Sequence, residues 1–182
     1  MQPTKLRLLL QSPPAIGKTT VARRLVALLQ EIGVPVGGFT TRELREHGQR
    51  VGFVVQAIDG SSAVIAHVDW TSSPEVGRYH VDVMAFEAVA LPALERARER
   101  GGVIVVDELG RMELASAAFV TEVHDLLTQD VALIATVHEA RHPVTDALKR
   151  RTDIEHCFVT RKNRDELPAL LRARLFPDCP AL

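Results

Sequence analysis

Residues 12–20, SPPAIGKTT, combine the residue types that bind phosphate groups. They follow an apolar run, LRLLLQ, and precede a segment whose apolar residues recur at helical spacing. The first N–H groups of a helix have no partner within the helix and lie at the positive end of its dipole, so they can hold an anion placed in the turn. Strand, glycine-containing turn, Lys-Thr and helix in this order are typical of a phosphate-binding loop, or P-loop.

The turn gives its residues distinct expected roles. Pro13 and Pro14 have no N–H group, so the donors are expected from the five positions that follow. These are Ala15, Ile16, Gly17, Lys18 and Thr19. We expect Lys18 to contact the β- and γ-phosphates of a nucleotide, and Thr19 to place its hydroxyl on Mg²⁺, which prefers oxygen ligands. The alternative is a strand, turn and helix that bind nothing, since the strict pattern has glycine where this chain has Ser12.

A second reactive pair, Asp107 and Glu108, follows the run VIVV at residues 103–106. Four consecutive β-branched residues predict a strand buried on both faces, where an acid is costly unless a cation meets it. We expect Asp107 to hold Mg²⁺ through water and Glu108 to orient and deprotonate the attacking water. The alternative is a strand end whose acids cap the next helix or meet solvent.

Arginine side chains could stabilise the negative charge of a transferring phosphoryl group. Arg111, just beyond the acid pair, is our first candidate. Four other arginines are alternatives: Arg42, Arg45, Arg150 and Arg151. Each could equally be a solvated surface charge.

Three further segments contain candidate functional residues. Residues 138–142, HEARH, match a zinc-protease pattern. We reject a zinc site here, because that pattern needs both histidines on one helix and Pro143 marks a boundary or first turn. Residues 163–165 follow the last expected strand and could border a base, although Asn163 could instead cap the next helix. Trp70 lies in an expected loop and should report nucleotide binding if that loop is a lid.

The hydrophobic pattern predicts an α/β fold of helices alternating with strands. Expected strands cover residues 6–11, 34–41, 103–108, 131–137 and 156–160, and expected helices cover 21–32, 83–100, 113–128 and 164–175. We interpret 1–182 as a single P-loop NTPase domain, with an inserted antiparallel β-ribbon at about 42–68 around the Asp59-Gly60 turn and a loop or lid at about 70–80. Pro92 is expected to kink its helix.

The long interval between the P-loop and the acid pair predicts the order of the central strands. It favours a RecA-like, mostly parallel sheet flanked by helices, in which the strand VALIATV separates the P-loop strand from the acid strand. In open α/β sheets, ligands bind at the carboxyl ends of such strands. Thr136, at the end of VALIATV, could sense the γ-phosphate, or it could be only a good strand former.

Composition restricts the classes of partner. The 182 residues carry a net charge of −1, so no overall basic field indicates nucleic acid. The apolar run near the start is too short to span a bilayer and leads into the turn rather than a cleavage site. Cys157 and Cys179 are too few for a disulfide scaffold. We therefore expect a cytoplasmic protein without membrane association.

Four stretches resemble the THEP-type nucleoside-triphosphatase family over nearly the whole chain. They are GFTTRELREHGQRVGF, VGRYHVDVMAFE, IVVDELGRMEL and TRKNRDEL. The resemblance implies Mg²⁺-dependent, slow hydrolysis of nucleoside 5'-triphosphates of broad specificity, giving the diphosphate and phosphate. The chain departs from the family at Ser12 and Ala15, where glycine is usual, and at Arg111, where lysine is expected.

The resemblance and the motifs together define the expected site. The nucleotide-binding residues are Ser12, Pro13, Pro14, Ala15, Ile16, Gly17, Lys18, Thr19, Thr20, Val103, Ile104, Val105, Val106, Asp107, Glu108, Leu109, Gly110 and Asn163; the catalytic ones are Lys18, Glu108 and Arg111; the metal ligands are Thr19 and Asp107. A nucleotide or small-molecule kinase and a nucleotide-dependent switch remain alternatives. The sequence leaves the preferred base, the oligomeric state and any protein partner open.

Overall fold

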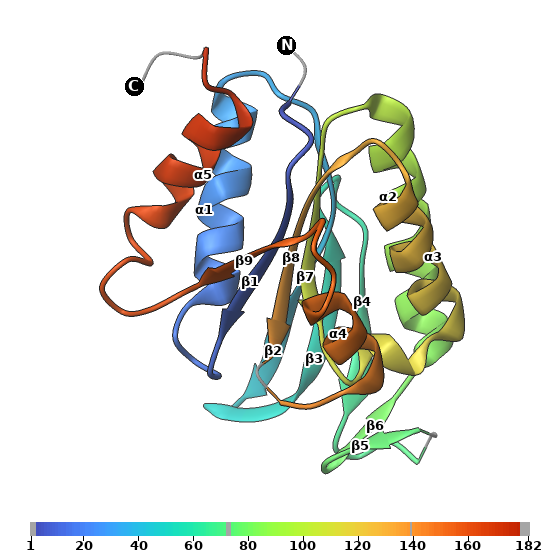
Figure 1. Cartoon of the computed structure of the whole chain (residues 1–182). Helices are drawn as coiled ribbons and strands as arrows, with labels where there is room; N and C mark the ends of the chain where they lie inside the picture. Colours follow the sequence, from blue (N-terminus) through green and yellow to red (C-terminus); the bar gives the residue numbers. More distant parts are fainter. Residues whose placement is uncertain (1–2, 72–73, 139, 179–182) are drawn as a thin grey trace.

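The computed structural model describes residues 3–71, 74–138 and 140–178. Within these ranges one nine-stranded sheet has the order β5-β6-β4-β3-β2-β7-β8-β1-β9 (Figure 1). The strands are β1 Arg7–Ser12, β2 Val36–Glu46, β3 Gln49–Ala57, β4 Ser62–His67, β5 Glu75–Val76, β6 Tyr79–Val81, β7 Val103–Leu109, β8 Ala132–His138 and β9 Glu155–Phe158. The helices are α1 Lys18–Glu31, α2 Val83–Arg100, α3 Ala117–Thr128, α4 Pro143–Lys149 and α5 Leu167–Leu175, with a 3₁₀ turn at Glu113–Ala115.

Five neighbouring strands, β2, β7, β8, β1 and β9, form the parallel part of the sheet. β8, which contains the predicted strand VALIATV, lies between β1 and β7, so the predicted order of the central strands is confirmed. Ser12 is in register with His138, and Val137 is in register with Leu109. The carboxyl ends of β1, β8 and β7 therefore meet at one edge of the sheet.

The other part of the sheet is antiparallel and contains the predicted ribbon. β3 and β4 pair on either side of the Asp59-Gly60 turn, as the sequence predicted. β2 is longer than expected and continues past Thr41 into this ribbon, because residues 39–46 pair with β3. The expectation of an irregular loop at 70–80 is wrong at β5 and β6, which form a short antiparallel pair there.

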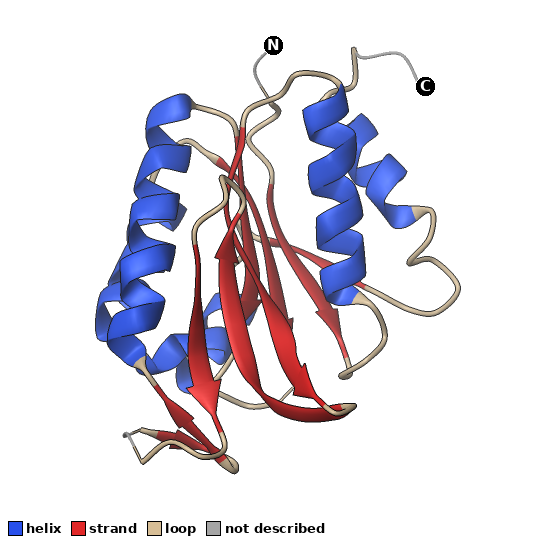
Figure 2. Cartoon of the chain, turned by 180° about the vertical axis from the view of Figure 1, so that it is seen from behind, coloured by secondary structure: helices blue, strands red, loops and turns tan. Residues whose placement is uncertain are grey.

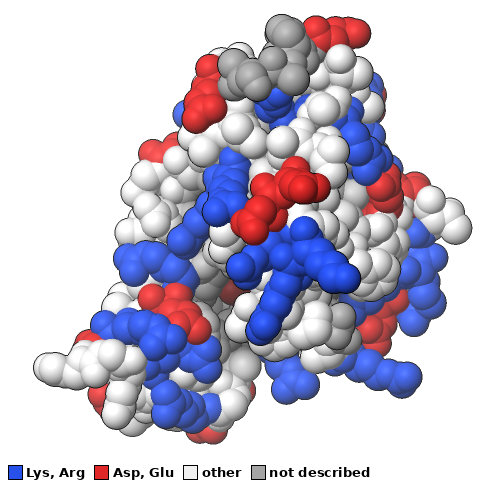
Figure 3. All heavy atoms as spheres, turned by 90° about the vertical axis from the view of Figure 1, so that its left-hand side faces the viewer, with Lys and Arg blue, Asp and Glu red and all other residues white. Residues whose placement is uncertain are grey.

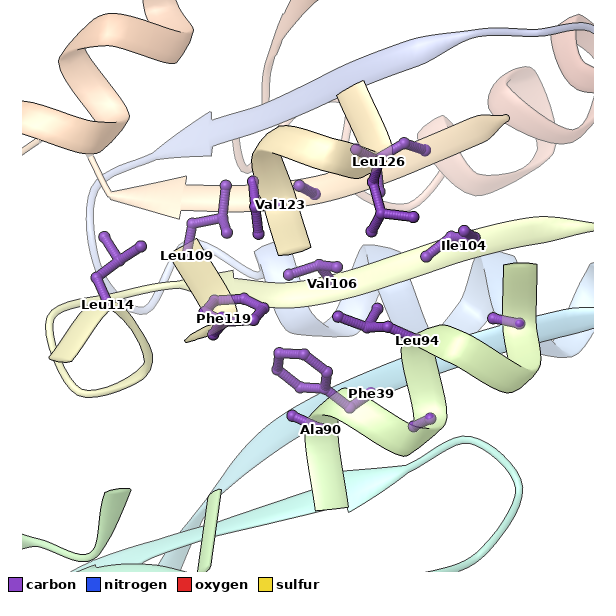
Figure 4. Close-up of a cluster of buried hydrophobic side chains, with 14 of the residues drawn as sticks. Phe39, Ala90, Leu94, Ile104, Val106, Leu109, Leu114, Phe119, Val123 and Leu126 are labelled. Atoms are coloured by element: carbon purple, nitrogen blue, oxygen red, sulfur yellow. The ribbon is translucent and has the colours of Figure 1, made fainter. Parts of the chain in front are cut away.

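Helices cover both faces of the sheet, with α1 and α5 on one face and α2 and α3 on the other (Figure 2). The α2–α3 face contains the larger hydrophobic cluster, in which side chains of β2, α2, β7 and α3 point toward one another (Figure 4). At its centre the rings of Phe39, Phe86 and Phe119 lie 5.1–5.6 Å apart in edge-to-face geometry. This packing fixes β7, the strand that carries the acid pair.

The structure corrects two predicted helix starts. The helix expected from residue 113 begins at Ala117, because the Ser116 side chain accepts a hydrogen bond from the Phe119 N–H. The last helix begins at Leu167 rather than at residue 164. Asn163 does not cap it, since its Oδ1 accepts from the Thr160 N–H.

Helix α4 was missed, and α2 was predicted with its observed bounds. Pro92 lies inside α2, and Gly101 ends that helix with a φ of 62°. Among the residues that the structure describes, no helix has the length and hydropathy needed to cross a membrane.

Candidate active site

The P-loop connects the end of β1 to the start of α1. Gly17 precedes helix α1 with a φ of 123°, a backbone conformation that favours glycine. A Cβ on this residue would also lie 3.3 Å from Cδ of Arg164. Lys18 is only 6% exposed, and its Nζ donates to the Ser12 carbonyl at 3.1 Å. The lysine therefore lies across the loop, where its charge faces the space that a phosphate would fill.

Asp107 is buried at the end of β7, with 1% of its surface exposed. The Thr136 hydroxyl of β8 donates to its Oδ1 at 2.5 Å, whereas its Oδ2 has no hydrogen-bond partner among the described residues. Burial raises the pKa of Asp107 to about 6, and the nearby hydroxyls of Thr136 and Thr19 oppose that rise. The expected pair of metal ligands, Thr19 and Asp107, therefore lies at one cavity.

Two more carboxyl groups follow Asp107. Glu108 is partly exposed, and its Oε1 contacts Nε2 of His138 at the end of β8. Glu113 is only 3% exposed and accepts a hydrogen bond from the Thr41 hydroxyl at 3.1 Å. Sequence reasoning missed Glu113 because it was assigned to the first turn of a helix.

One cavity of about 830 Å³ joins the P-loop, the three carboxyl groups and the ribbon. Its cations are Lys18, Arg23, Arg42, Arg50, Arg111, Arg141 and Arg164. Figure 3, a view from the α1 and α5 side, shows Lys and Arg side chains on both sides of a hollow in the lower half of the molecule. The cavity is therefore suited to a strongly anionic ligand.

Most of the predicted site residues line this cavity. From the list above they are Pro14, Ala15, Gly17, Lys18, Thr19, Thr20, Asp107, Glu108, Leu109, Gly110 and Arg111. Ser12, Pro13 and Ile16 do not line it. Of the alternative arginines, Arg42 lines the cavity, whereas Arg45, Arg150 and Arg151 do not.

Two predicted groups lie away from the cavity. Residues 103–106 are at most 1% exposed and pack in the hydrophobic clusters on both sheet faces, so their side chains cannot contact a nucleotide. Asn163 also does not line the cavity, because its side chain is bonded within its own turn to Phe158 and Thr160. The neighbouring Arg164 lines the cavity instead, and its guanidinium donates to the Ile16 carbonyl at 3.2 Å.

The two histidines of HEARH stand on different elements. His138 ends β8, and the His142 side chain accepts from the Val144 N–H at the start of α4. Both line the cavity, but they do not share a helix as the zinc-protease pattern requires. Glu139 lies outside the described residues.

Comparison with known proteins identifies the family. A family model described as NTPase matches residues 7–171. The nucleoside-triphosphatase THEP1 of Thermotoga sp. (strain RQ2) is 34% identical over 162 residues, which cover 89% of this chain and 91% of that protein. The chain belongs to the THEP1-type nucleoside-triphosphatase family.

Other THEP1-type proteins share the sequence and the fold. The cancer-related nucleoside-triphosphatase homolog of Mus musculus is 34% identical over 171 residues, which cover 87% of this chain and 90% of that protein. A crystal structure of THEP1 from the hyperthermophile Aquifex aeolicus has a TM-score of 0.84 and 30% identity, and covers 94% of this chain and 99% of that chain. The resemblance seen in the sequence is confirmed, and the matched residues 7–171 include the whole candidate site of this THEP1-type chain.

Proposed function

We propose that this chain hydrolyses the terminal phosphoanhydride of nucleoside 5'-triphosphates in the cytoplasm, with Mg²⁺ at Thr19 and Asp107. Membership of the THEP1-type nucleoside-triphosphatases supports the reaction. The P-loop lysine, the Thr19 hydroxyl and the acid pair share one cavity rich in cations, which supports a triphosphate as the ligand.

The observation that carries the metal assignment is the buried Oδ2 of Asp107, which has no partner among the described residues. A buried carboxylate oxygen without a partner is unfavourable in the free protein. Asp107 and the Thr19 hydroxyl together offer the hard oxygen donors that Mg²⁺ prefers, so the residues fit this ion. When bound, Mg²⁺ would neutralise part of the charge on the phosphate oxygens.

Side chains and backbone groups of the chain would bind the phosphates, activate the water and stabilise the transferring group. The N–H groups at the start of α1 and the Lys18 ammonium would bind the β- and γ-phosphates. Glu108 would orient a water in line with the γ-phosphorus and take its proton as the new P–O bond forms and the bond to the β-phosphate oxygen breaks. Arg111, which lines the cavity, would stabilise the charge on the transferring group.

Phosphate release from ATP, GTP, CTP and UTP tests this function, measured with Mg²⁺ and with excess EDTA. We expect release that requires Mg²⁺, that is lost in a folded Lys18→Ala variant and that falls to a small residual rate in folded Glu108→Gln. A kinase would instead form diphosphate without free phosphate when an acceptor is present. Release that persists in EDTA, or that is undiminished in Glu108→Gln, would contradict the assignment.

A further inference from the structure

Glu113 is a buried acid that the steps above leave without a role. It lines the same cavity as Glu108 and yet is only 3% exposed. In the described part of the chain its carboxyl has no Lys, Arg or His within ion-pair distance, and its side-chain partner is the Thr41 hydroxyl. Acids are rarely buried without a cationic partner, so this arrangement needs an explanation in terms of its neighbours.

The loop between β7 and α3 directs Glu113 back toward Glu108. Leu109 and Leu114, at the two ends of this loop, point into the hydrophobic core (Figure 4). The Leu114 N–H donates to the Gly110 carbonyl at 2.9 Å and closes the turn. The loop is therefore held in place, and its charged residues Arg111 and Glu113 line the cavity.

Gly110 lies close to the carboxyl groups of both Glu108 and Glu113. A Cβ on Gly110 would lie 2.6 Å from Oε2 of Glu113 and 3.0 Å from Oε1 of Glu108. A side chain at position 110 would therefore push one or both carboxyl groups away, and glycine leaves room for them. Gly110 and Glu113 therefore lie near the Glu108 side chain, and the Oε1 of Glu108 contacts His138.

The charges around Glu113 favour its neutral form. The ionisable groups that face Glu113 are Glu108 and Asp107, both on β7. Strand β2 contributes the neutral Thr41 hydroxyl. His138 of β8 contacts Glu108 rather than Glu113. Burial, followed by the negative charge of Glu108, raises the pKa of Glu113 to about 8. A neutral acid can stand beside an ionised carboxylate without bringing two like charges together.

We propose that Glu113 is a positioning residue for the water-activating Glu108, that Thr41 holds it in that place and that Gly110 leaves room for it. The inference rests on the proposed hydrolysis and assigns a role that acts through Glu108. Glu113 fills the space beside the Glu108 carboxylate and keeps it at the cavity. A displacement of a reacting group by about 1 Å can lower a rate by about 10²-fold, so the loss of this support should appear in kcat.

Steady-state phosphate release separates this role from a structural one. In Glu113→Ala we expect kcat to fall by about 10- to 100-fold while KM for the Mg²⁺-nucleotide changes by less than about threefold. Glu113→Gln is neutral and has nearly the same shape, so it should keep kcat within about threefold at neutral pH. Glu87→Ala is the matched control, because Glu87 accepts from Ser116 beside the same 3₁₀ turn and lies outside the cavity; its kcat should not change.

A second background identifies the route of the effect. In Glu108→Gln, the further change Glu113→Ala should lower the residual rate by less than about twofold, because a positioning residue has no effect without the residue that it positions. If Glu113→Ala does not fold, as judged by circular dichroism, Thr41→Val takes its place and should lower kcat in the wild-type background alone.

Two results would overturn the proposal. One is an unchanged kcat in folded Glu113→Ala, and the other is an equal fall in kcat in the wild-type and Glu108→Gln backgrounds. Both are distinct from a failure of the proposed function, in which the wild-type chain itself would release no phosphate with Mg²⁺.

Discussion

Replacing Glu113 by glutamine should change how the stability of the protein depends on pH. The wild-type side chain must lose its proton inside the protein as the pH rises, whereas glutamine is neutral at every pH. We therefore expect Glu113→Gln to become steadily more stable than the wild type between about pH 6 and pH 9.

The direction and size follow from the raised pKa of Glu113, about 8 in the folded chain against 4.5 for the free side chain. Below both values the carboxyl is protonated in the folded and unfolded states, so it adds no pH dependence. As the pH rises from 4.5 to about 8, only the folded state keeps the proton, and stability is lost. At about 1.4 kcal/mol for each pKa unit this loss is roughly 5 kcal/mol, of which roughly 3 kcal/mol falls between pH 6 and pH 9.

Urea unfolding measured at several pH values, without Mg²⁺ or nucleotide, provides the assay. The quantity of interest is the free energy of unfolding of Glu113→Gln minus that of the wild type. Glu155→Gln is the control. Arg174 lowers the pKa of Glu155, so this side chain is ionised in both the folded and the unfolded wild type throughout this pH range. The reasoning is refuted if the difference for Glu113→Gln is as independent of pH as that for Glu155→Gln.

Three other substitutions test separate parts of the structure. Arg111→Ala should lower kcat for phosphate release far more than it weakens nucleotide binding, and unchanged turnover would exclude the residue from the mechanism. Asp82→Ala removes the side chain that caps α2 at the Ala85 N–H and should lower the free energy of unfolding by about 1 kcal/mol in urea titrations. Phe119→Ala removes one ring from the fully buried aromatic cluster and should lower the free energy of unfolding by about 3–5 kcal/mol. A loss under about 1 kcal/mol would contradict the packing.

The parts of the fold that were predicted correctly depend on signals within a few neighbouring residues. The P-loop was recognisable because its apolar strand, glycine turn and helix are adjacent in the sequence. The run at 103–106 indicated a doubly buried strand because β-branched residues follow one another there. The position of β8 between β1 and β7 followed from the length of chain between the two motifs.

The site residues that were missed or misplaced depend on contacts between distant segments. Glu113 looks like a helix residue in the sequence, and its role becomes visible only when Thr41, 72 positions earlier, reaches it from β2. The charged residues 42–46 at the end of β2 have no hydrophobic strand pattern. They form a strand because they pair with β3. Asn163 was assigned to the cavity, but a local turn uses its polar atoms and leaves Arg164 to face the ligand space.

The pairing of β1 has a consequence for the order of assembly during synthesis. Its two neighbours, β8 and β9, lie in the last third of the chain. Leu8, Leu9 and Leu10 therefore leave the ribosome long before the strands that shelter them. A nascent chain cannot complete the pairing of β1 until residues 155–158 have emerged, and until then this apolar strand is open to aggregation and to chaperones.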